Sequence, residues 1–493
     1  MKKSAKFLTG ACIAVGVLGA ALAVILSLPS DKNQDTVSAD GTDLLLFDKS
    51  ALHVDDITIK NRSGEYRLLG YDYAKEKDTS QSSDTSPSNV PVVYTMQEYP
   101  ESLLSGMMTN MLVSECQTAA ALRIVDKSGK KYRDYGLAPP SAEAVIVYSD
   151  DSVIKLSLGD EAPDKSGTYC RIDGDKNVYL VNSSSVDMFL MDKLQLFDKT
   201  LSDEMEESDS IASVSVSGSG YEKPVLLSNE PNDRSQSPYT MTSPYFECCD
   251  SSASVGFASL FFDMTASEVA AAGVKEAQRK EYGLDKPYMD VRITTESGRE
   301  IEILASEKDD DGYYYLMKKN GNIIYRESAE ETAWYGVTYK EFLNDAVFMP
   351  DLFHVGSAVI TCEGTAEEYV LKRETVVNEM YEEVVQTTLY YHDEIIDYSR
   401  LFHFIQNIAG ITREENAPDS SDGCEELLNI RLNFEGGQTE AFALYQTPDE
   451  KVFTVLNGHI ENYTDRDYAL QVIAQVPKIH SDESLEILEK SAE

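Results

Sequence analysis

Short segments of alternating apolar and polar residues, joined in pairs by glycine turns, recur along this chain of 493 residues. Such alternation on both sides of a glycine turn is typical of a β-hairpin. Asp173-Gly174, Asn320-Gly321 and Asn457-Gly458 stand at corresponding turns, where both dipeptides tolerate the positive φ of a tight hairpin. From Gly174 to Gly321 is 147 residues, and from there to Gly458 is 137. The spacing predicts one module of antiparallel strand pairs, built three times.

Each copy of the module is also expected to carry helices. Apolar residues at helical spacing predict one over Leu104–Leu112, and we interpret its Met107, Met108 and Met111 as filling the core. A capping box predicts a second helix over Thr265–Val274. Apolar residues at helical spacing predict a third helix over Tyr398–Ile405. The predicted fold class is therefore α+β: three repeated modules of antiparallel sheet, each with helices on one face.

An uncharged apolar run from Phe7 to Leu28 precedes the modules. As a helix it would span roughly 33 Å at ~1.5 Å per residue, enough to cross a hydrocarbon core of about 30 Å. Lys2, Lys3 and Lys6 come before it, so the N-terminus is expected in the cytoplasm and the body outside it. A cleaved signal peptide is the alternative, but its apolar region is usually only ~7–15 residues. We expect a single-pass protein of the cell membrane with a single N-terminal transmembrane helix and an extracytoplasmic body.

These features divide the chain into six predicted segments. A serine-rich stretch, residues 74–91, is interpreted as a loop inside the first module and not as a linker. The segments are a cytoplasmic tip and anchor (1–28), a polar tether (29–43), three modules (44–201, 210–350 and 352–480) and an acidic C-terminal tail (481–493).

The charge balance excludes some partners. With 43 Lys and Arg against 85 Asp and Glu, the formal net charge is −42. Phosphate contacts need clustered cations, so we expect no nucleic-acid partner. The same charge disfavours anionic lipid surfaces and anionic wall polymers, and Trp334 is the single tryptophan for sugar stacking. Seven cysteines are too few for a disulfide framework in a chain of this length.

One family resemblance rests on short motifs. The stretch Tyr135–Pro140, followed by Gly159 and Tyr169–Arg171, resembles the family catalogued as domain of unknown function 4340. The second copy carries the same signature at Tyr282–Pro287, and the third copy lacks it. The resemblance extends over most of the chain after residue 44.

This resemblance implies a cellular location and a kind of partner, but no activity. Members look like membrane-anchored bacterial envelope proteins that are often encoded beside ABC-type transporters. Subunits of such a transporter are therefore the partners that the resemblance suggests. It implies no catalytic residue that could be carried over to this chain.

Metal-ligand patterns are weak. His392 and His403 would lie roughly 16 Å apart if they shared one helix, too far to hold one metal. Glu307, Asp309 and Asp311 imitate the start of a calcium loop, but Lys318 stands where the loop needs an acid. We interpret this stretch as a solvated turn and predict no metal site and no cofactor.

Patterns for covalent or acid–base chemistry are equally weak. Ser152 and Lys155 have Ser-x-x-Lys spacing, but they fall on a predicted strand. Glu300 and Glu302 could in principle flank a glycosidic bond, yet they alternate with isoleucines as the wet face of a strand does. The adjacent Cys248-Cys249 is interpreted as two unreactive thiols in a loop. No catalytic residue is predicted.

Two functions follow as expectations. The first is a non-catalytic, membrane-anchored extracytoplasmic scaffold or auxiliary subunit, in particular of an ABC-type transporter complex. The alternative is a cell-wall or polysaccharide-active hydrolase that uses a carboxylate pair the sequence does not single out. The first hypothesis makes the protein no enzyme, and the sequence leaves open whether it has a small-molecule ligand.

Overall fold

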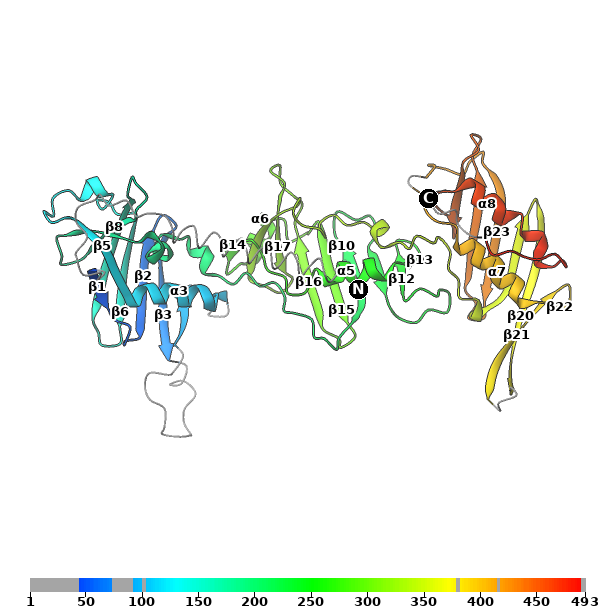
Figure 1. The fold of residues 1–493 in the computed structure, drawn as a ribbon, viewed down its shortest axis with the longest axis horizontal. Helices are drawn as coiled ribbons and strands as arrows, with labels where there is room; N and C mark the ends of the chain where they lie inside the picture. Colours follow the sequence, from blue (N-terminus) through cyan, green and yellow to red (C-terminus); the bar gives the residue numbers. More distant parts are fainter. Residues whose placement is uncertain (1–43, 73–91, 100–102, 378–381, 415–416, 489–493) are drawn as a thin grey trace, which may run out of the picture. The chain divides into compact units, whose positions relative to one another are not determined.

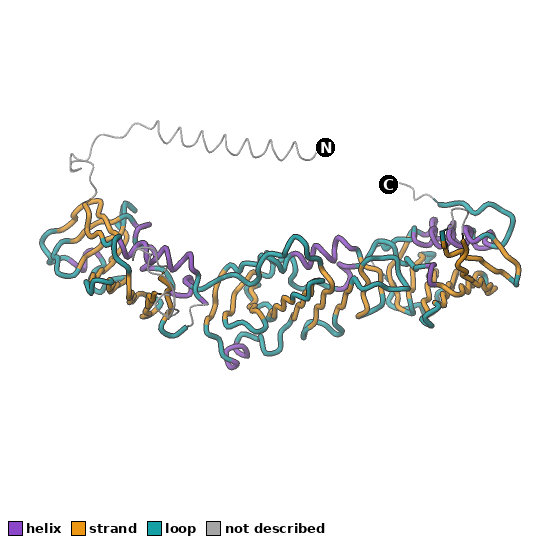
Figure 2. The backbone as a smooth tube through the Cα atoms, turned by 90° about the horizontal axis from the view of Figure 1, so that it is seen from below, coloured by secondary structure: helices purple, strands orange, loops and turns teal. Residues whose placement is uncertain are grey.

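The computed structural model describes residues 44–72, 92–99, 103–377, 382–414 and 417–488. Strands account for 44% of the structure and helices for 18%, and Figure 2 shows strands in orange as most of the regular structure. The predicted α+β class is therefore wrong, because the fold is mostly β and consists of three large antiparallel sheets. The helices are too few and too short to form a full layer on each sheet.

The first and second sheets have nine strands each. The first runs in the order β1-β5-β9-β8-β7-β6-β2-β3-β4, and the second in the order β13-β12-β11-β10-β15-β16-β17-β18-β14. The strands of the first are β1 (Leu44–Asp48), β2 (Val54–Asn61), β3 (Gly64–Asp72), β4 (Val92–Met96), β5 (Thr118–Asp126), β6 (Ala142–Tyr148), β7 (Val153–Glu161), β8 (Thr168–Ile172) and β9 (Val178–Val181). Those of the second are β10 (Ile211–Ser217), β11 (Val225–Ser228), β12 (Tyr239–Ser243), β13 (Glu247–Cys249), β14 (Glu268–Ala272), β15 (Met289–Thr295), β16 (Glu300–Ala305), β17 (Tyr313–Lys318) and β18 (Ile323–Ser328).

The third sheet has eight strands in the order β22-β21-β20-β19-β23-β24-β25-β26. They are β19 (Val355–Cys362), β20 (Thr365–Val377), β21 (Glu383–Tyr391), β22 (Glu394–Ile396), β23 (Glu425–Phe434), β24 (Thr439–Gln446), β25 (Val452–Leu456) and β26 (His459–Thr464). All three sheets share one connection: a strand of an early hairpin (β2, β10 or β19) pairs with the first strand of a later four-stranded meander. The α-helices are α3 (Gly106–Gln117), α4 (Asp187–Leu190), α5 (Ser251–Ser259), α6 (Glu276–Glu281), α7 (Tyr398–Ala409) and α8 (Arg466–Ile473).

The chain packs into two compact units. One comprises the described residues up to Arg62 together with Val113–Leu190, and the other comprises Ser63–Leu112 and the described residues from Met191 onward. The second and third sheets therefore belong to the same unit. The predicted module boundaries are not tested by this division and stay a prediction.

The turn chemistry at the repeated hairpins is largely as expected. Gly174 and Gly458 adopt φ of +84° and +83°, and Asn457 adopts +50°. Gly321 does not share this conformation; its N–H donates to the carbonyl of Lys318. Two of the three predicted glycine turns thus need the left-handed region that glycine occupies at low cost.

Two helix predictions need correction. The predicted helix at Leu104–Leu112 exists as α3, but Met107 is 68% exposed and Met111 is 50% exposed, so the core-filler interpretation is wrong for these two. Met108 is half-buried. The buried side of α3 is formed by Thr109, Leu112 and Cys116 instead. The residues Thr265–Val274 do not form a helix, because Glu268–Ala272 pairs with β18 at the edge of the second sheet. Tertiary pairing there overrides the local capping pattern.

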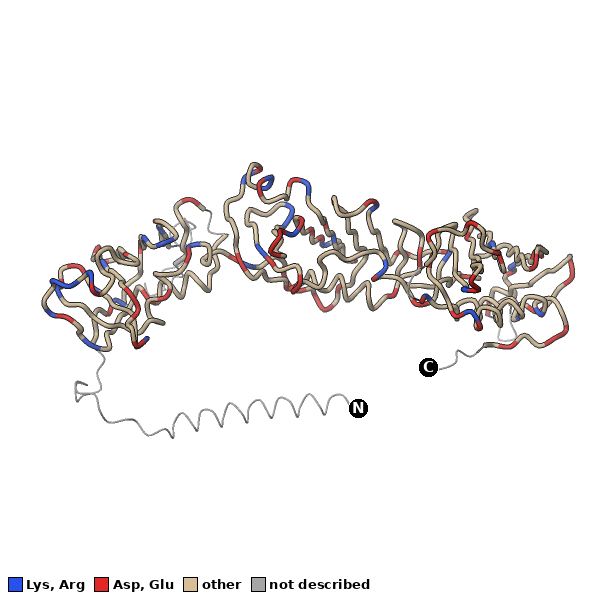
Figure 3. The backbone as a smooth tube through the Cα atoms, turned by 90° about the horizontal axis from the view of Figure 1, so that it is seen from above, with Lys and Arg blue, Asp and Glu red and all other residues tan. Residues whose placement is uncertain are grey.

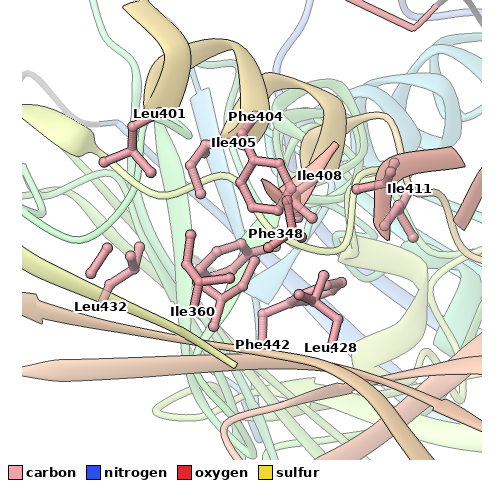
Figure 4. Close-up of a cluster of buried hydrophobic side chains, with 14 of the residues drawn as sticks. Phe348, Ile360, Leu401, Phe404, Ile405, Ile408, Ile411, Leu428, Leu432 and Phe442 are labelled. Carbon is pink, nitrogen blue, oxygen red and sulfur yellow. The ribbon is translucent and has the colours of Figure 1, made fainter. Parts of the chain in front are cut away.

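The third sheet shows how a helix completes a core. The helix α7 begins after Asp397, whose carboxylate accepts from the N–H of Ser399 as an N-cap. Figures 1 and 4 show α7 lying over one face of the sheet. Its buried side chains point toward buried side chains of the strands, with Phe348 packed among them. The labelled residues of this cluster are Phe348, Ile360, Leu401, Phe404, Ile405, Ile408, Ile411, Leu428, Leu432 and Phe442.

The described part of the predicted C-terminal tail is held against α7. The Asn407 amide donates to the carbonyl of Glu486 and accepts from the N–H of Leu488. Arg400 donates to the carbonyls of Lys478 and Glu483. Residues up to Leu488 are therefore part of the third sheet's packing, although the sequence suggested only an acidic extension.

The membrane expectations are also corrected. Among the described residues, no helix is long and apolar enough to cross a membrane. On this finding we withdraw the predicted single-pass membrane localisation. The run from Phe7 to Leu28 that motivated it, and the serine-rich stretch 74–91, lie outside the described residues.

The core of the third sheet provides a test of the fold. Replacing the fully buried Phe442 by alanine is expected to lower the free energy of unfolding by about 3–5 kcal/mol, because it leaves a cavity among tightly packed side chains. The matched control is Phe353→Ala, since Phe353 is 62% exposed and should change stability by only about 0.5 kcal/mol or less. Urea denaturation followed by circular dichroism measures both, and equal losses would contradict this assignment of the core.

Candidate functional site

The most unusual chemistry of the described residues is a buried ion cluster that joins the second and third sheets. We call Glu247, Arg413 and Glu461 the Arg413 network. The Arg413 Nη2 donates to Glu247 Oε2 at 2.8 Å, and Nε donates to Glu461 Oε2 at 3.3 Å. The side chain of Arg413 is 9% exposed and those of the two glutamates 1% and 2%. The guanidinium also donates from Nη1 to the carbonyls of Asn344 and Ala346, so all three of its nitrogens donate.

One guanidinium cannot balance two buried carboxylates, so the network has to hold a proton. Burial, together with the charge of Glu461 and a hydrogen bond to it, raises the pKa of Glu247 to about 9 although Arg413 acts in the opposite direction. Within the described residues Glu247 Oε1 and Glu461 Oε1 accept no other hydrogen bond, and His459 Nε2 lies 3.6 Å from Glu461 Oε1. A proton on Glu247, donated to Glu461, satisfies both oxygens and leaves one positive and one negative charge.

A second buried pair lies at the same junction. Arg234 Nε donates to Glu440 Oε1 at 2.9 Å, and the Glu440 side chain is 4% exposed. Burial raises the pKa of Glu440 to about 7, against the opposing effect of Arg234. The Arg234 guanidinium also lies 3.5 Å from the ring centre of Phe246. Backbone bonds from Gln236 to Met349 and from Asp351 to Arg234 complete the junction.

Beside the Arg413 network lies a pocket of about 350 Å³, which we call the tyrosine pocket. Loops at one end of the second sheet form it: the segment between β10 and β11, the turn after β12, the residue before β15 and the segment after β18. Four half-buried tyrosines line it, with glycine, valine and proline between them. They are Tyr221, Tyr245, Tyr288 and Tyr339.

The third sheet supports one wall of the tyrosine pocket. The Tyr245 ring stacks on the His459 ring with centroids 3.5 Å apart, and Tyr339 meets Tyr245 edge-on at 5.7 Å. Burial lowers the pKa of His459 below its ordinary value, so the ring that Tyr245 contacts is neutral at pH 7. Lys223 places its ammonium 5.3 Å from the Tyr245 ring centre. Tyr245 is thus fixed by contacts from both sheets.

The polar groups of the tyrosine pocket are suited to recognition. The Tyr221 hydroxyl donates to the carbonyl of Val337 at 2.6 Å. Within the described residues, the hydroxyls of Tyr245, Tyr288 and Tyr339 make no hydrogen bond, so they can donate to a ligand. Burial raises the pKa of Tyr339 above its ordinary value, so this hydroxyl keeps its proton. Ring faces and hydroxyl donors bind a ligand without reacting with it.

The structure shows where the residues that the sequence offered as metal ligands lie. His392 follows β21 in a turn, stacked on Tyr391, whereas His403 lies on α7, so the two do not share a helix. The acidic stretch before β17 is a turn in which Asp309 accepts from the N–H groups of Asp311 and Tyr313. The described residues contain no group of three His, Cys, Asp or Glu side chains that could hold a metal ion.

The candidates for covalent and acid–base chemistry are engaged in structural contacts. Ser152 lies in the turn between β6 and β7 and accepts from the Lys49 ammonium at 2.9 Å. Glu302 is paired with Arg292 at 2.8 Å and with Lys319. Cys248 and Cys249 lie on β13 and not in a loop, and burial raises the pKa of these thiols to about 11 and about 12. The described cysteines are free.

Sequence reasoning missed the residues of this candidate site. The Arg413 network unites segments that lie 166 and 48 residues apart in the chain, and no local pattern marks it. A weak signal exists for Glu247, because an acid directly before two cysteines on a short apolar strand must be buried and needs a partner. Trp334, suggested for sugar stacking, is 4% exposed and packs against Phe261 and Tyr314.

The family signature makes a tight backbone corner. Gly136 has a φ of +66°, and a Cβ there would lie 2.3 Å from the Asp160 carboxyl carbon. The second copy repeats the corner, with Gly283 at +71°. Both corners are followed by a buried leucine whose N–H bonds to the carbonyl five residues earlier, Leu137 to Tyr132 and Leu284 to Arg279. The signature residues therefore serve the fold and not the tyrosine pocket.

Comparison with protein families confirms the predicted resemblance. Residues 101–253 match the family described as Domain of unknown function (DUF4340), a shorter stretch than the predicted resemblance over most of the chain after residue 44. The match includes the signature at Tyr135–Pro140 and extends into α5, but not the signature at Tyr282–Pro287. No curated protein and no solved structure matches the chain.

The proton in the Arg413 network has a measurable consequence. Folded Glu247 keeps its proton up to about pH 9, whereas the unfolded side chain ionises near its ordinary value of 4.5. The folded state therefore binds more protons between these values, and each pH unit in this window lowers the free energy of unfolding by up to ~1.4 kcal/mol. Glu247→Gln is neutral in both states, so we expect the variant to gain stability relative to the wild type as the pH rises from 5 to 9.

Urea denaturation at several pH values, followed by the fluorescence of the single tryptophan, measures this difference. Trp334 is buried in the core of the second sheet, so it reports the unfolding of the unit that contains Glu247. Glu276→Gln is the control, because the Glu276 side chain is exposed on α6 and its curve should run parallel to that of the wild type. Parallel curves for the wild type and Glu247→Gln would contradict a buried proton at this position.

Proposed function

We propose that this chain is a non-catalytic binding protein that assembles with protein partners, with the tyrosine pocket as its recognition site. The observation that carries the proposal is the chemistry of that pocket. Its lining offers ring faces and three hydroxyl donors that are not used within the described residues. Such groups gain binding energy from burial and stacking, and aromatic residues are enriched where proteins recognise one another.

The buried carboxylates favour a structural role over a hydrolytic one. Retaining and inverting glycosidases hold their two carboxyl groups roughly 5 Å or more apart, so that a sugar or a water fits between them. Glu247 and Glu461 are in direct hydrogen-bond contact and are shielded from water by the surrounding protein. Asp290 and Glu302 also contact each other and are balanced by Arg292 and Lys319. The hydrolase alternative stays a prediction that these pairs do not support.

The kind of partner comes from the family resemblance. Because members look as if they accompany ABC-type transporters, subunits of such a transporter are the first partners to examine. Fold and family alone do not define function, so this part of the proposal is an analogy and the pocket chemistry is its physical basis. The large acidic excess of the chain favours a partner that presents basic groups.

Site-specific photocrosslinking tests the proposal. Glu222 lines the tyrosine pocket with an exposed side chain, so a benzophenone amino acid at this position should crosslink a bound partner in cells. The same substitution at the exposed Glu276 on α6 is the matched control and should give little crosslinking. Mass spectrometry then identifies the product.

Reproducible crosslinking of one protein from position 222 alone would support a binding protein, and transporter subunits among the products would support the analogy. If neither position captures a protein in the cells that produce this chain, the proposed function is wrong. Release of soluble sugars from envelope glycans by the purified chain would instead favour the hydrolase.

A further inference from the structure

A second pocket adjoins the tyrosine pocket. Its volume is about 590 Å³, and three acidic side chains line it together with Lys308 and backbone of the loops around β17 and β18. The acids are Glu307, Asp311 and Glu330. Tyr288 and Gly336 line both pockets, so the two are continuous across these residues. We call the combined feature the Tyr288 groove; each half lies within the range of ~300–1,000 Å³ that is usual for ligand sites.

The Tyr288 ring, which lies between the two halves of the groove, is held in position by other aromatic rings. Tyr288 stacks on Tyr335 at 5.6 Å, and Tyr335 stacks in turn on the fully buried Tyr314 at 4.3 Å. The Tyr335 hydroxyl donates to the carbonyl of Ser306 at 3.1 Å. The chain also approaches this ring closely at Gly220, where a Cβ would lie 2.4 Å from the Tyr288 ring. A ligand therefore meets a ring that is already in position, and its binding costs little ordering entropy.

The acidic half of the groove is not charge-compensated. In the part of the chain that the structure describes, the carboxylates of Glu307, Asp311 and Glu330 form no hydrogen bond or ion pair, and all three residues are exposed. Glu222 adds a further exposed carboxylate on the tyrosine side, against Lys223 and Lys308. Figure 3 shows Asp and Glu, in red, recurring along the described chain. The groove therefore attracts a cation and repels an anionic ligand.

We propose that the Tyr288 groove binds an extended, proline-containing segment of a partner protein, with an Arg or Lys of that segment in the acidic half. This inference deepens the proposed function and rests on it. Proline rings stack on flat aromatic faces, and a polyproline II segment exposes carbonyl oxygens that have no internal hydrogen bonds. The free hydroxyls of Tyr245, Tyr288 and Tyr339 supply donors to such carbonyls. The uncompensated carboxylates favour this ligand over a neutral or anionic glycan, which offers no cation.

Peptide binding to the purified full-length chain tests the ligand class. The probe is fluorescein-labelled Pro-Pro-Leu-Pro-Pro-Arg, measured by fluorescence anisotropy at low and high salt. The comparison probes end in Glu instead of Arg or carry Ala in place of each Pro. We expect each change to weaken binding at least about tenfold, and the affinity of the Arg probe to fall with added salt because exposed charges are screened.

Variants of the groove assign the binding to its two halves. Tyr288→Ala should weaken binding of the Arg probe at least about tenfold, whereas Tyr288→Phe keeps the ring and should lose only severalfold. The double variant Asp311→Asn and Glu330→Gln should remove most of the preference for Arg over Glu at the end of the probe. Tyr390→Ala, a half-buried tyrosine on β21 outside the groove, is the matched control and should bind as the wild type does. Trp334 fluorescence checks that each variant is folded.

The outcomes separate this inference from the function on which it rests. Equal affinity for the Arg and Glu probes, or unchanged binding by folded Tyr288→Ala, would overturn the proposed ligand class. If position 222 still crosslinks a partner in that case, the binding function stands and only the proposed ligand class is wrong. If a neutral glycan binds the groove and no peptide does, both the ligand class and the choice of a protein partner are overturned.

Discussion

A single guanidinium that faces two carboxylates is the constraint on which the junction of the second and third sheets depends. Arg413, Glu247 and Glu461 lie where water hardly reaches, so their charges have to cancel within the cluster. One carboxyl keeps a proton, and Nη1 of the guanidinium donates to two backbone carbonyls of the segment between the sheets. Because removal of one partner from a buried ion pair leaves an uncompensated charge, typically at a cost of about 3–5 kcal/mol, loss of the Arg413 guanidinium would strongly destabilise this junction.

The geometry of the tyrosine pocket follows from the same constraint. Residues two apart on a strand point to the same side, so His459 and Glu461 on β26 both face the second sheet. Glu461 binds Arg413 there, and His459 stacks on Tyr245, which precedes Glu247 by two residues. The ion network and the aromatic wall are thus neighbouring contacts of one interface. A change that loosens the network would also displace Tyr245, although neither glutamate lines the pocket.

Whether a feature of the fold or the site could be predicted depends on how far apart in the sequence its interacting residues lie. Hairpins such as those at Gly174 and Gly458 were predictable because the turn chemistry and the strand alternation are local. The helix at Thr265–Val274 was predicted wrongly because a capping pattern is also local, and the pairing of Glu268–Ala272 with β18 overrode it. The exposed Met107 and Met111 show that spacing predicts a helix without telling which face is covered. The site itself could not be predicted, since Glu247 and Arg413 are 166 residues apart and only the sheet order brings them together.

The family match includes only some of the residues that form the tyrosine pocket and the Arg413 network. Residues 101–253 include Tyr221, Tyr245 and Glu247, which supply one wall of the tyrosine pocket and one carboxylate of the network. Tyr288 and Arg413, together with the acidic half of the groove, lie beyond the match. The matched part also contains the Gly136 corner, a feature of backbone packing. The matched segment therefore contains the corner and one wall of the tyrosine pocket, but not Arg413, whose charge balances the network that holds this wall in place. The groove has to be sought in each relative from its own residues after the match.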